Sequence, residues 1–194
     1  MVNTTDSQHI AFGRAQIVSQ SGETFDQAVQ TIISPANTRG IMPASGAHSL
    51  RSVAGAELER IMMGMAPLQL GSAVITGSGK LSERRIESII HVVVSAEPGG
   101  ERSLPVVRKA LASGFELAFR ERIHSIAVPL LTGAHLDTPD QLRQWIDGIV
   151  DEVVAHLRRD RVRLESIVMV SRYPGDIDIL NDALAEARSA AWLA

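Results

Sequence analysis

The chain has 194 residues and no cysteine, with 45% hydrophobic residues, 21% charged residues and a formal net charge of −3. These values are typical of one globular domain with a sizeable core, and they exclude disulfides, thiolate metal sites and cysteine nucleophiles. The negative charge disfavours broad nucleic-acid binding, because such binding needs a basic face. No apolar run reaches the roughly 18 residues of a membrane span, and the start, MVNTTDSQHI, lacks the pattern of a signal peptide. We therefore expect a cytoplasmic protein without membrane contact.

Strand-like and helix-like segments alternate along the chain, after residues 1–10, which we expect to form a flexible extension. The predicted strands lie at 11–19, 29–34, 70–77, 86–96, 124–131 and 165–171. The predicted helices lie at 48–65, 103–122, 138–157 and 176–193. This alternation predicts a single domain, residues 1–194, with the fold class α/β: a three-layer α/β/α sandwich around a central mixed sheet.

Two loops of small residues, 35–47 and 132–137, each follow directly after a buried strand. Sheets of this class bind ligands beyond the carboxyl ends of their strands, so we expect both loops at that end. A loop of this kind before a helix offers backbone N–H groups to an anion. The pair therefore predicts a phosphate-containing ligand, and the alternative is a connector that is small only to pack closely.

Three other patterns favour structural interpretations. The segment 77–80, GSGK, resembles a phosphate loop, but its first glycine is misplaced and Leu81 stands where Ser or Thr is required. His91 lies among apolar neighbours of a predicted strand and is expected to be a hydrogen-bonded core histidine. Met62, Met63 and Met65 are expected to fill the core.

The arginines between 158 and 163 follow a predicted helix, where the helix dipole favours cations, so we interpret them as a solvated helix end rather than a nucleic-acid patch. The six histidines lack metal-ligand spacing. We therefore predict no metal site and no cofactor.

Several segments in order resemble the macro domain family. Gly22-Glu23-Thr24 is similar to the family's Gly-Asp turn, and Ser34-Pro35-Ala36-Asn37 is similar to its Asn-Ala-Ala-Asn motif. Residues 51–58, RSVAGAEL, fit the helix that follows, and 71–93 and 125–139 continue the pattern. The resemblance spans about residues 13–185 and implies a domain that binds ADP-ribose or a related nucleotide.

The resemblance also implies roles for particular residues. Glu23 would accept a hydrogen bond from the adenine amino group, Tyr173 would lie near the adenine face, and residues 42–47 and 131–136 would bind the diphosphate through backbone N–H groups. Asn37 would face the distal ribose and, if the protein is an enzyme, would be the catalytic residue that positions water. The implied ligand-binding residues are Glu23, Thr24, Ser34, Asn37, Ala44, Ser45, Gly46, Ala47, Leu131, Thr132, Gly133, Ala134, His135, Leu136 and Tyr173.

The chain departs from the family pattern in the first loop. Met42 and Pro43 replace part of a glycine run, and Pro43 has no N–H to offer a phosphate. Ala47 occupies the position of an Asp that many hydrolytic members use. Two alternatives therefore remain beside binding: hydrolysis of an ADP-ribosylated protein or small molecule, and an interaction or assembly domain with a degenerate pocket. A protein partner is left open.

Overall fold

The computed structural model describes residues 9–42, 49–133, 136, 138–159 and 163–192. Within these ranges the strands form one sheet in the order β1-β2-β7-β6-β3-β5-β4. Their bounds are β1 (His9–Phe12), β2 (Ala15–Ser21), β3 (Thr31–Asn37), β4 (Ala73–Gly77), β5 (Ser88–Ser95), β6 (Ser125–Pro129) and β7 (Ser166–Ser171). The five central strands are parallel, and the edge strands β1 and β4 are antiparallel to their neighbours. The predicted mixed sheet is confirmed.

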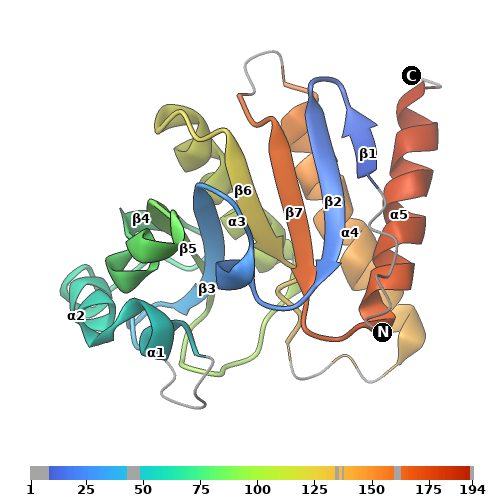
Figure 1. Ribbon diagram of the computed structural model, residues 1–194. Helices are drawn as coiled ribbons and strands as arrows, with labels where there is room; N and C mark the ends of the chain where they lie inside the picture. The colour runs from blue at the N-terminus through green and yellow to red at the C-terminus, as the bar shows by residue number, and fades with distance from the viewer. Residues whose placement is uncertain (1–8, 43–48, 134–135, 137, 160–162, 193–194) are drawn as a thin grey trace, which may run out of the picture.

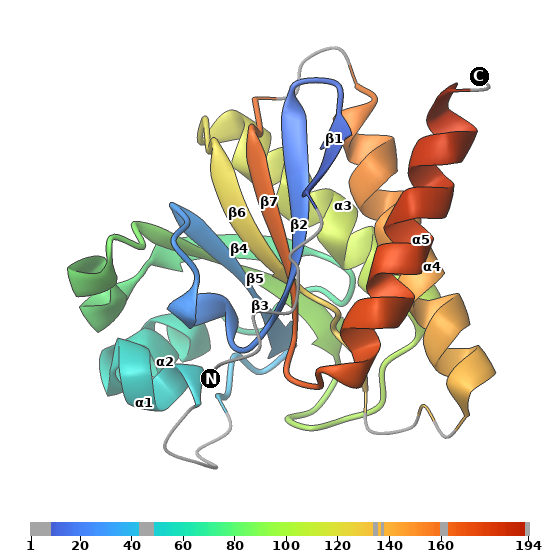
Figure 2. The same cartoon turned by 45° about the vertical axis from the view of Figure 1, so that its right-hand side comes forward.

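Helices cover both faces of the sheet. Their bounds are α1 (Leu50–Ala54), α2 (Ala56–Gly64), α3 (Leu104–Arg120), α4 (Pro139–Leu157) and α5 (Gly175–Trp192), with 3-10 helices η1 (Thr24–Asp26) and η2 (Gly79–Arg84). Figures 1 and 2 show α3, α4 and α5 on one side of the sheet and α1 and α2 on the other. The three-layer α/β/α prediction is therefore confirmed. In the part of the chain that is described, no helix has both the length and the apolar character that crossing a bilayer requires.

The central strand β5 shows why the chain needs both layers of helices. Ile90 and Val92 belong to the core cluster that includes α3, whereas Ile89 and Val93 belong to the clusters on the side of α1 and α2. A parallel strand covered on both faces is apolar on both faces, which explains its unbroken apolar run. Each fully buried side chain of this size contributes roughly 1.5–3 kcal/mol.

Two predicted elements are divided by glycines. The single strand predicted at 11–19 is a hairpin, because Gly13, with a φ of 60°, lies in the turn between β1 and β2. The single helix predicted at 48–65 is broken between α1 and α2 at Gly55, whose φ of 99° is not helical. Apolar periodicity does not reveal such breaks when both halves bury side chains against the same layer.

The strand predicted at 29–34 continues to Asn37, so the first loop begins later than expected. β3 pairs with β5 up to Asn37, but its pairing with β6 extends only over Thr31 and Ile32. Proline cannot donate to a ladder and is tolerated where a strand is paired on one side, which fits Pro35 in this stretch. Beyond Ile32 the strands β3 and β6 separate.

The methionines of α2 and its end are only partly core residues. Met62 is 1% exposed, as predicted, but Met63 and Met65 are 51% and 42% exposed, so the prediction was wrong for these two. The reason is that α2 rests on the sheet with one face only.

His91 of β5 is a core histidine, as the sequence predicts. It is fully buried, and its Nε2 atom forms a 2.9 Å hydrogen bond with Oγ1 of Thr76 on β4. Burial disfavours the charged imidazolium and lowers the pKa of His91 to about 3. His91 is therefore neutral in the folded protein at pH 7.

This pKa makes stability depend on pH. The unfolded histidine takes up a proton below its ordinary pKa of about 6.5, whereas the folded one does not, so stability falls as pH decreases from that value toward the folded pKa. Replacing His91 by glutamine removes this titration. We expect the difference in unfolding free energy between the wild type and His91→Gln to shrink by about 2 kcal/mol between pH 7 and pH 4.5. Urea unfolding at a series of pH values measures it, and parallel curves would contradict the buried neutral state.

Candidate functional site

A cleft of about 670 Å³ lies at the carboxyl ends of the parallel strands. Its walls come mainly from five segments that follow strands β2, β3, β5, β6 and β7. Figure 1 shows these strands running toward the same, lower edge of the sheet. The separation of β3 from β6 beyond Ile32 leaves room between them, and the volume suits a ligand of nucleotide size.

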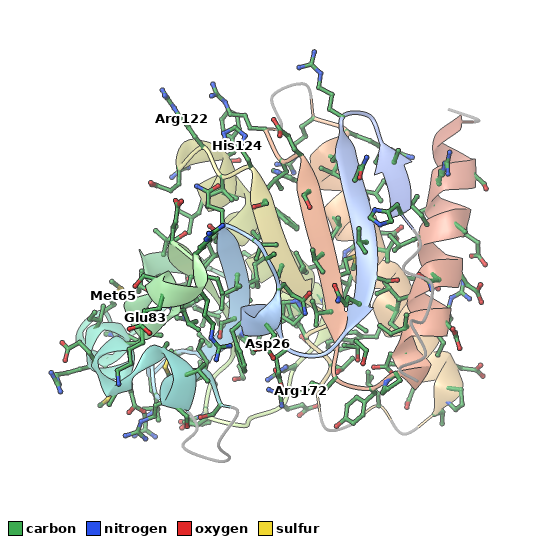
Figure 3. The ribbon with its side chains drawn as sticks, viewed as in Figure 1. Asp26, Met65, Glu83, Arg122, His124 and Arg172 are labelled. Atoms are coloured by element: carbon green, nitrogen blue, oxygen red, sulfur yellow. The ribbon has the colours of Figure 1, made fainter. Side chains whose placement is uncertain are left out.

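The turn after β2 is anchored to β7. The N–H of Gly22 donates to the carbonyl of Ser171 at 2.8 Å, and Nε2 of Gln27 donates to the carbonyl of Glu23 at 2.9 Å. The carboxylate of Glu23 pairs with Nε of Arg172 at 2.7 Å, and its side chain is 21% exposed. Figure 3 shows Arg172 at the end of the strands, on the same side of the molecule as Asp26 of η1. A carboxylate is thus held at one end of the cleft.

Asn37 ends β3 and fixes the turn that follows. Its Nδ2 donates to the carbonyl of Ile41 at 2.7 Å, and its Oδ1 accepts from the N–H groups of Arg39 at 3.1 Å and Ile41 at 3.3 Å. Gly40 has a φ of 67°, and a Cβ there would lie 2.4 Å from the carbonyl oxygen of Met62, so only glycine fits. The Asn37 amide lines the cleft while it holds its own loop.

Glu59 of α2 holds the start of the first loop. One carboxylate oxygen accepts from the N–H of Met42 at 2.9 Å, and the other pairs with Nε of Arg51 at 3.0 Å. The carboxylate therefore ties α1 and α2 to the last described residue before the gap at 43–48.

The second loop is held by side chains from the layer of α3 and α4. The indole Nε1 of Trp145 donates to the carbonyl of Leu130 at 2.9 Å. Nη1 of Arg102 donates to the carbonyls of Leu131 and Thr132 at 3.2 Å and 3.1 Å. Leu131 adopts a left-handed conformation with a φ of 53°. The loop is therefore fixed without a glycine at its left-handed position.

The structure brings eight of the residues predicted for the site together. The cleft is lined by Glu23, Thr24, Ser34, Asn37, Leu131, Thr132, Gly133 and Tyr173. Leu136 is not among the lining residues and packs, partly buried, against the main core cluster. The other predicted residues, Ala44, Ser45, Gly46, Ala47, Ala134 and His135, lie outside the described residues. The glycine-rich segment 77–80 is not among the lining residues either, in keeping with its rejection as a phosphate loop.

Three arginines of the cleft, Arg51, Arg102 and Arg172, were not predicted. Arg172 directly follows β7, and residues at the carboxyl ends of parallel strands commonly face the ligand, so its position in the sequence could have indicated it. Arg102 lies in the connection before α3, and nothing in the local sequence indicates its contact with a loop that follows β6. Among the described residues, no group of three or more His, Asp or Glu side chains could hold a metal ion.

Comparison with known proteins identifies the family. A family model described as Macro domain matches residues 33–139. An uncharacterized protein of Aquifex aeolicus is 31% identical over 156 residues, which cover 77% of this chain and 86% of the relative.

Solved structures share the fold. The Oceanobacillus iheyensis macrodomain with ADP has a TM-score of 0.74 at 18% identity, covering 95% of this chain and 97% of that one. The Trypanosoma brucei macrodomain in complex with ADP-ribose has a TM-score of 0.71 at 20% identity, covering 87% of this chain and 68% of that one. With a matching family model over more than half of its length and a relative above 30% identity, this chain belongs to the macro domain family.

Proposed function

We propose that this protein binds ADP-ribose or a related nucleotide in the cleft beyond β3 and β6. The observation that carries the proposal is the convergence of Glu23, the Asn37 turn and the 130–133 loop on one cavity of about 670 Å³. The solved macrodomains with ADP and ADP-ribose support it, since they share this fold.

The contacts assign a part of the ligand to each segment. Glu23 can accept from an adenine amino group, and Tyr173, 67% exposed beside the same end of the cleft, offers an aromatic face. The N–H groups of Leu131, Thr132 and Gly133 form no hydrogen bond within the described part of the chain. They can donate to the diphosphate, as loop N–H groups do at anion sites. Asn37 shapes the turn beside the ribose.

The cleft favours binding over hydrolysis. Among the described lining residues the only carboxylate is that of Glu23, and Arg172 engages it. The role predicted for Asn37 in an enzyme is to position water, but its amide oxygen and nitrogen both bond within its own turn, so we assign Asn37 to fixing the loop. An open cavity likewise argues against a purely structural domain with a closed pocket. The cytoplasmic location and the absence of broad nucleic-acid binding remain predictions from the sequence.

Calorimetric titration with ADP-ribose tests the proposal directly, with Asn37→Ala as the diagnostic variant. The variant loses the three hydrogen bonds that fix residues 37–41, so we expect its affinity to fall about tenfold or more. Asn181→Ala, the same chemical change outside the cleft, serves as the control and should bind like the wild type. Absence of heat and of a thermal shift with millimolar ADP-ribose in the wild type would refute the proposal.

Glu23→Gln tests recognition of the base. A carboxylate accepts from the adenine amino group but repels the carbonyl oxygen of hypoxanthine, whereas a glutamine amide can face either one. We expect the preference for ADP-ribose over its inosine analogue to fall about tenfold in Glu23→Gln. Glu97→Gln, which breaks the exposed pair with Arg39, should leave the preference unchanged. An unchanged preference in Glu23→Gln would place the base elsewhere.

A further inference from the structure

Side-chain donors form hydrogen bonds with the backbone carbonyls of residues 130–132, where the second loop begins. Three consecutive carbonyl oxygens, those of Leu130, Leu131 and Thr132, each accept from Trp145 or Arg102 at 2.9–3.2 Å. Trp145 lies on α4, and Arg102 lies in the connection that precedes α3. In an extended strand successive carbonyls would alternate in direction, so this arrangement requires a change of backbone conformation.

Leu131 provides that change. Its φ of 53° is left-handed, a conformation that is strained for a residue with a Cβ. Such strain persists only where the surroundings determine it, and here they do, through the Arg102 hydrogen bond to its carbonyl and a side chain only 4% exposed. A left-handed residue within a turn gathers successive N–H groups into a concave anion site. The N–H groups of Leu131, Thr132 and Gly133 have no other partner in the described residues.

Arg102 differs from the other cleft arginines in its partners. Arg51 pairs with Glu59 and Arg172 pairs with Glu23, whereas the described partners of Arg102 are two neutral carbonyls. Both bonds use Nη1, so the N–H groups of Nε and Nη2 have no partner among the described residues, and Arg102 is one of the residues that line the cleft. Burial lowers the pKa of Arg102, which reflects a cation taken partly out of water without a carboxylate beside it. Such a cation favours an anionic ligand.

We propose that Arg102 is the residue that makes this cleft select a diphosphate, by fixing the 131–133 N–H groups in place and adding the one cleft charge that has no described acidic partner. Trp145 assists as a positioning residue through the Leu130 carbonyl. The inference rests on the proposed nucleotide ligand.

The test compares ligands with and without the diphosphate in Arg102→Gln, Arg102→Lys and Trp145→Phe. We expect Arg102→Gln to weaken ADP-ribose binding at least about tenfold and adenosine binding less than about threefold, since adenosine carries no charge. Arg102→Lys keeps the positive charge but loses the planar guanidinium, so we expect its affinity for ADP-ribose to lie between those of Arg102→Gln and the wild type. Trp145→Phe keeps an aromatic side chain, smaller than the indole, but loses the N–H donor, and it should weaken ADP-ribose binding about threefold.

Arg120→Gln, which removes an arginine from an exposed pair with Glu116, is the matched control and should behave like the wild type. Equal losses for ADP-ribose and adenosine in Arg102→Gln, or no loss, would overturn the proposal. If the wild type binds neither ligand, the proposed function fails, and amide hydrogen exchange then decides the role of Arg102. The Leu130 N–H donates to the Val170 carbonyl, so its exchange reports on whether the start of the loop stays in place. Exchange of this N–H that is at least about tenfold faster in Arg102→Gln than in Arg120→Gln supports a loop-fixing role, and equal exchange overturns it.

Discussion

The cleft depends on one constraint, the short pairing between β3 and β6. Because β3 stays hydrogen-bonded to β5 up to Asn37 but leaves β6 after Ile32, the sheet opens between two parallel strands at their carboxyl ends. The loops that follow these strands then face each other across the gap instead of packing together. The Asn37 turn follows one of these strands and the held 130–133 segment follows the other, and both line the cleft.

Charges in the cleft are arranged in pairs with one exception. The Glu23 carboxylate pairs with Arg172, and the Glu59 carboxylate, just outside the cleft lining, pairs with Arg51 and also accepts from the N–H of Met42. Arg102 is bound to carbonyls, so its charge meets no acidic group among the described residues. Under the proposed function, the diphosphate of the ligand would supply the anionic partner for this arginine.

Local sequence patterns predicted much of the fold correctly. The features that they missed depend on contacts between elements that are distant in the chain. His91 was recognised as a core residue because its neighbours are apolar, and β5 confirmed it. The break at Gly55 was missed because apolar spacing continues across it, and Met63 was assigned to the core because the sequence does not show which arc of α2 meets the sheet. Arg102 escaped notice because its partners lie 29 and 30 residues away in the chain.

The sequence by itself determined the alternation of strands and helices, the small-residue loops after buried strands, and the order of segments that resembles the family. These are local properties, set by hydrophobic period and turn chemistry. Only the tertiary structure decided that β3 and β6 separate, that Leu131 is held in a left-handed conformation, and that an arginine ahead of α3 reaches the loop after β6. Those features depend on how distant elements pack, which no local pattern encodes.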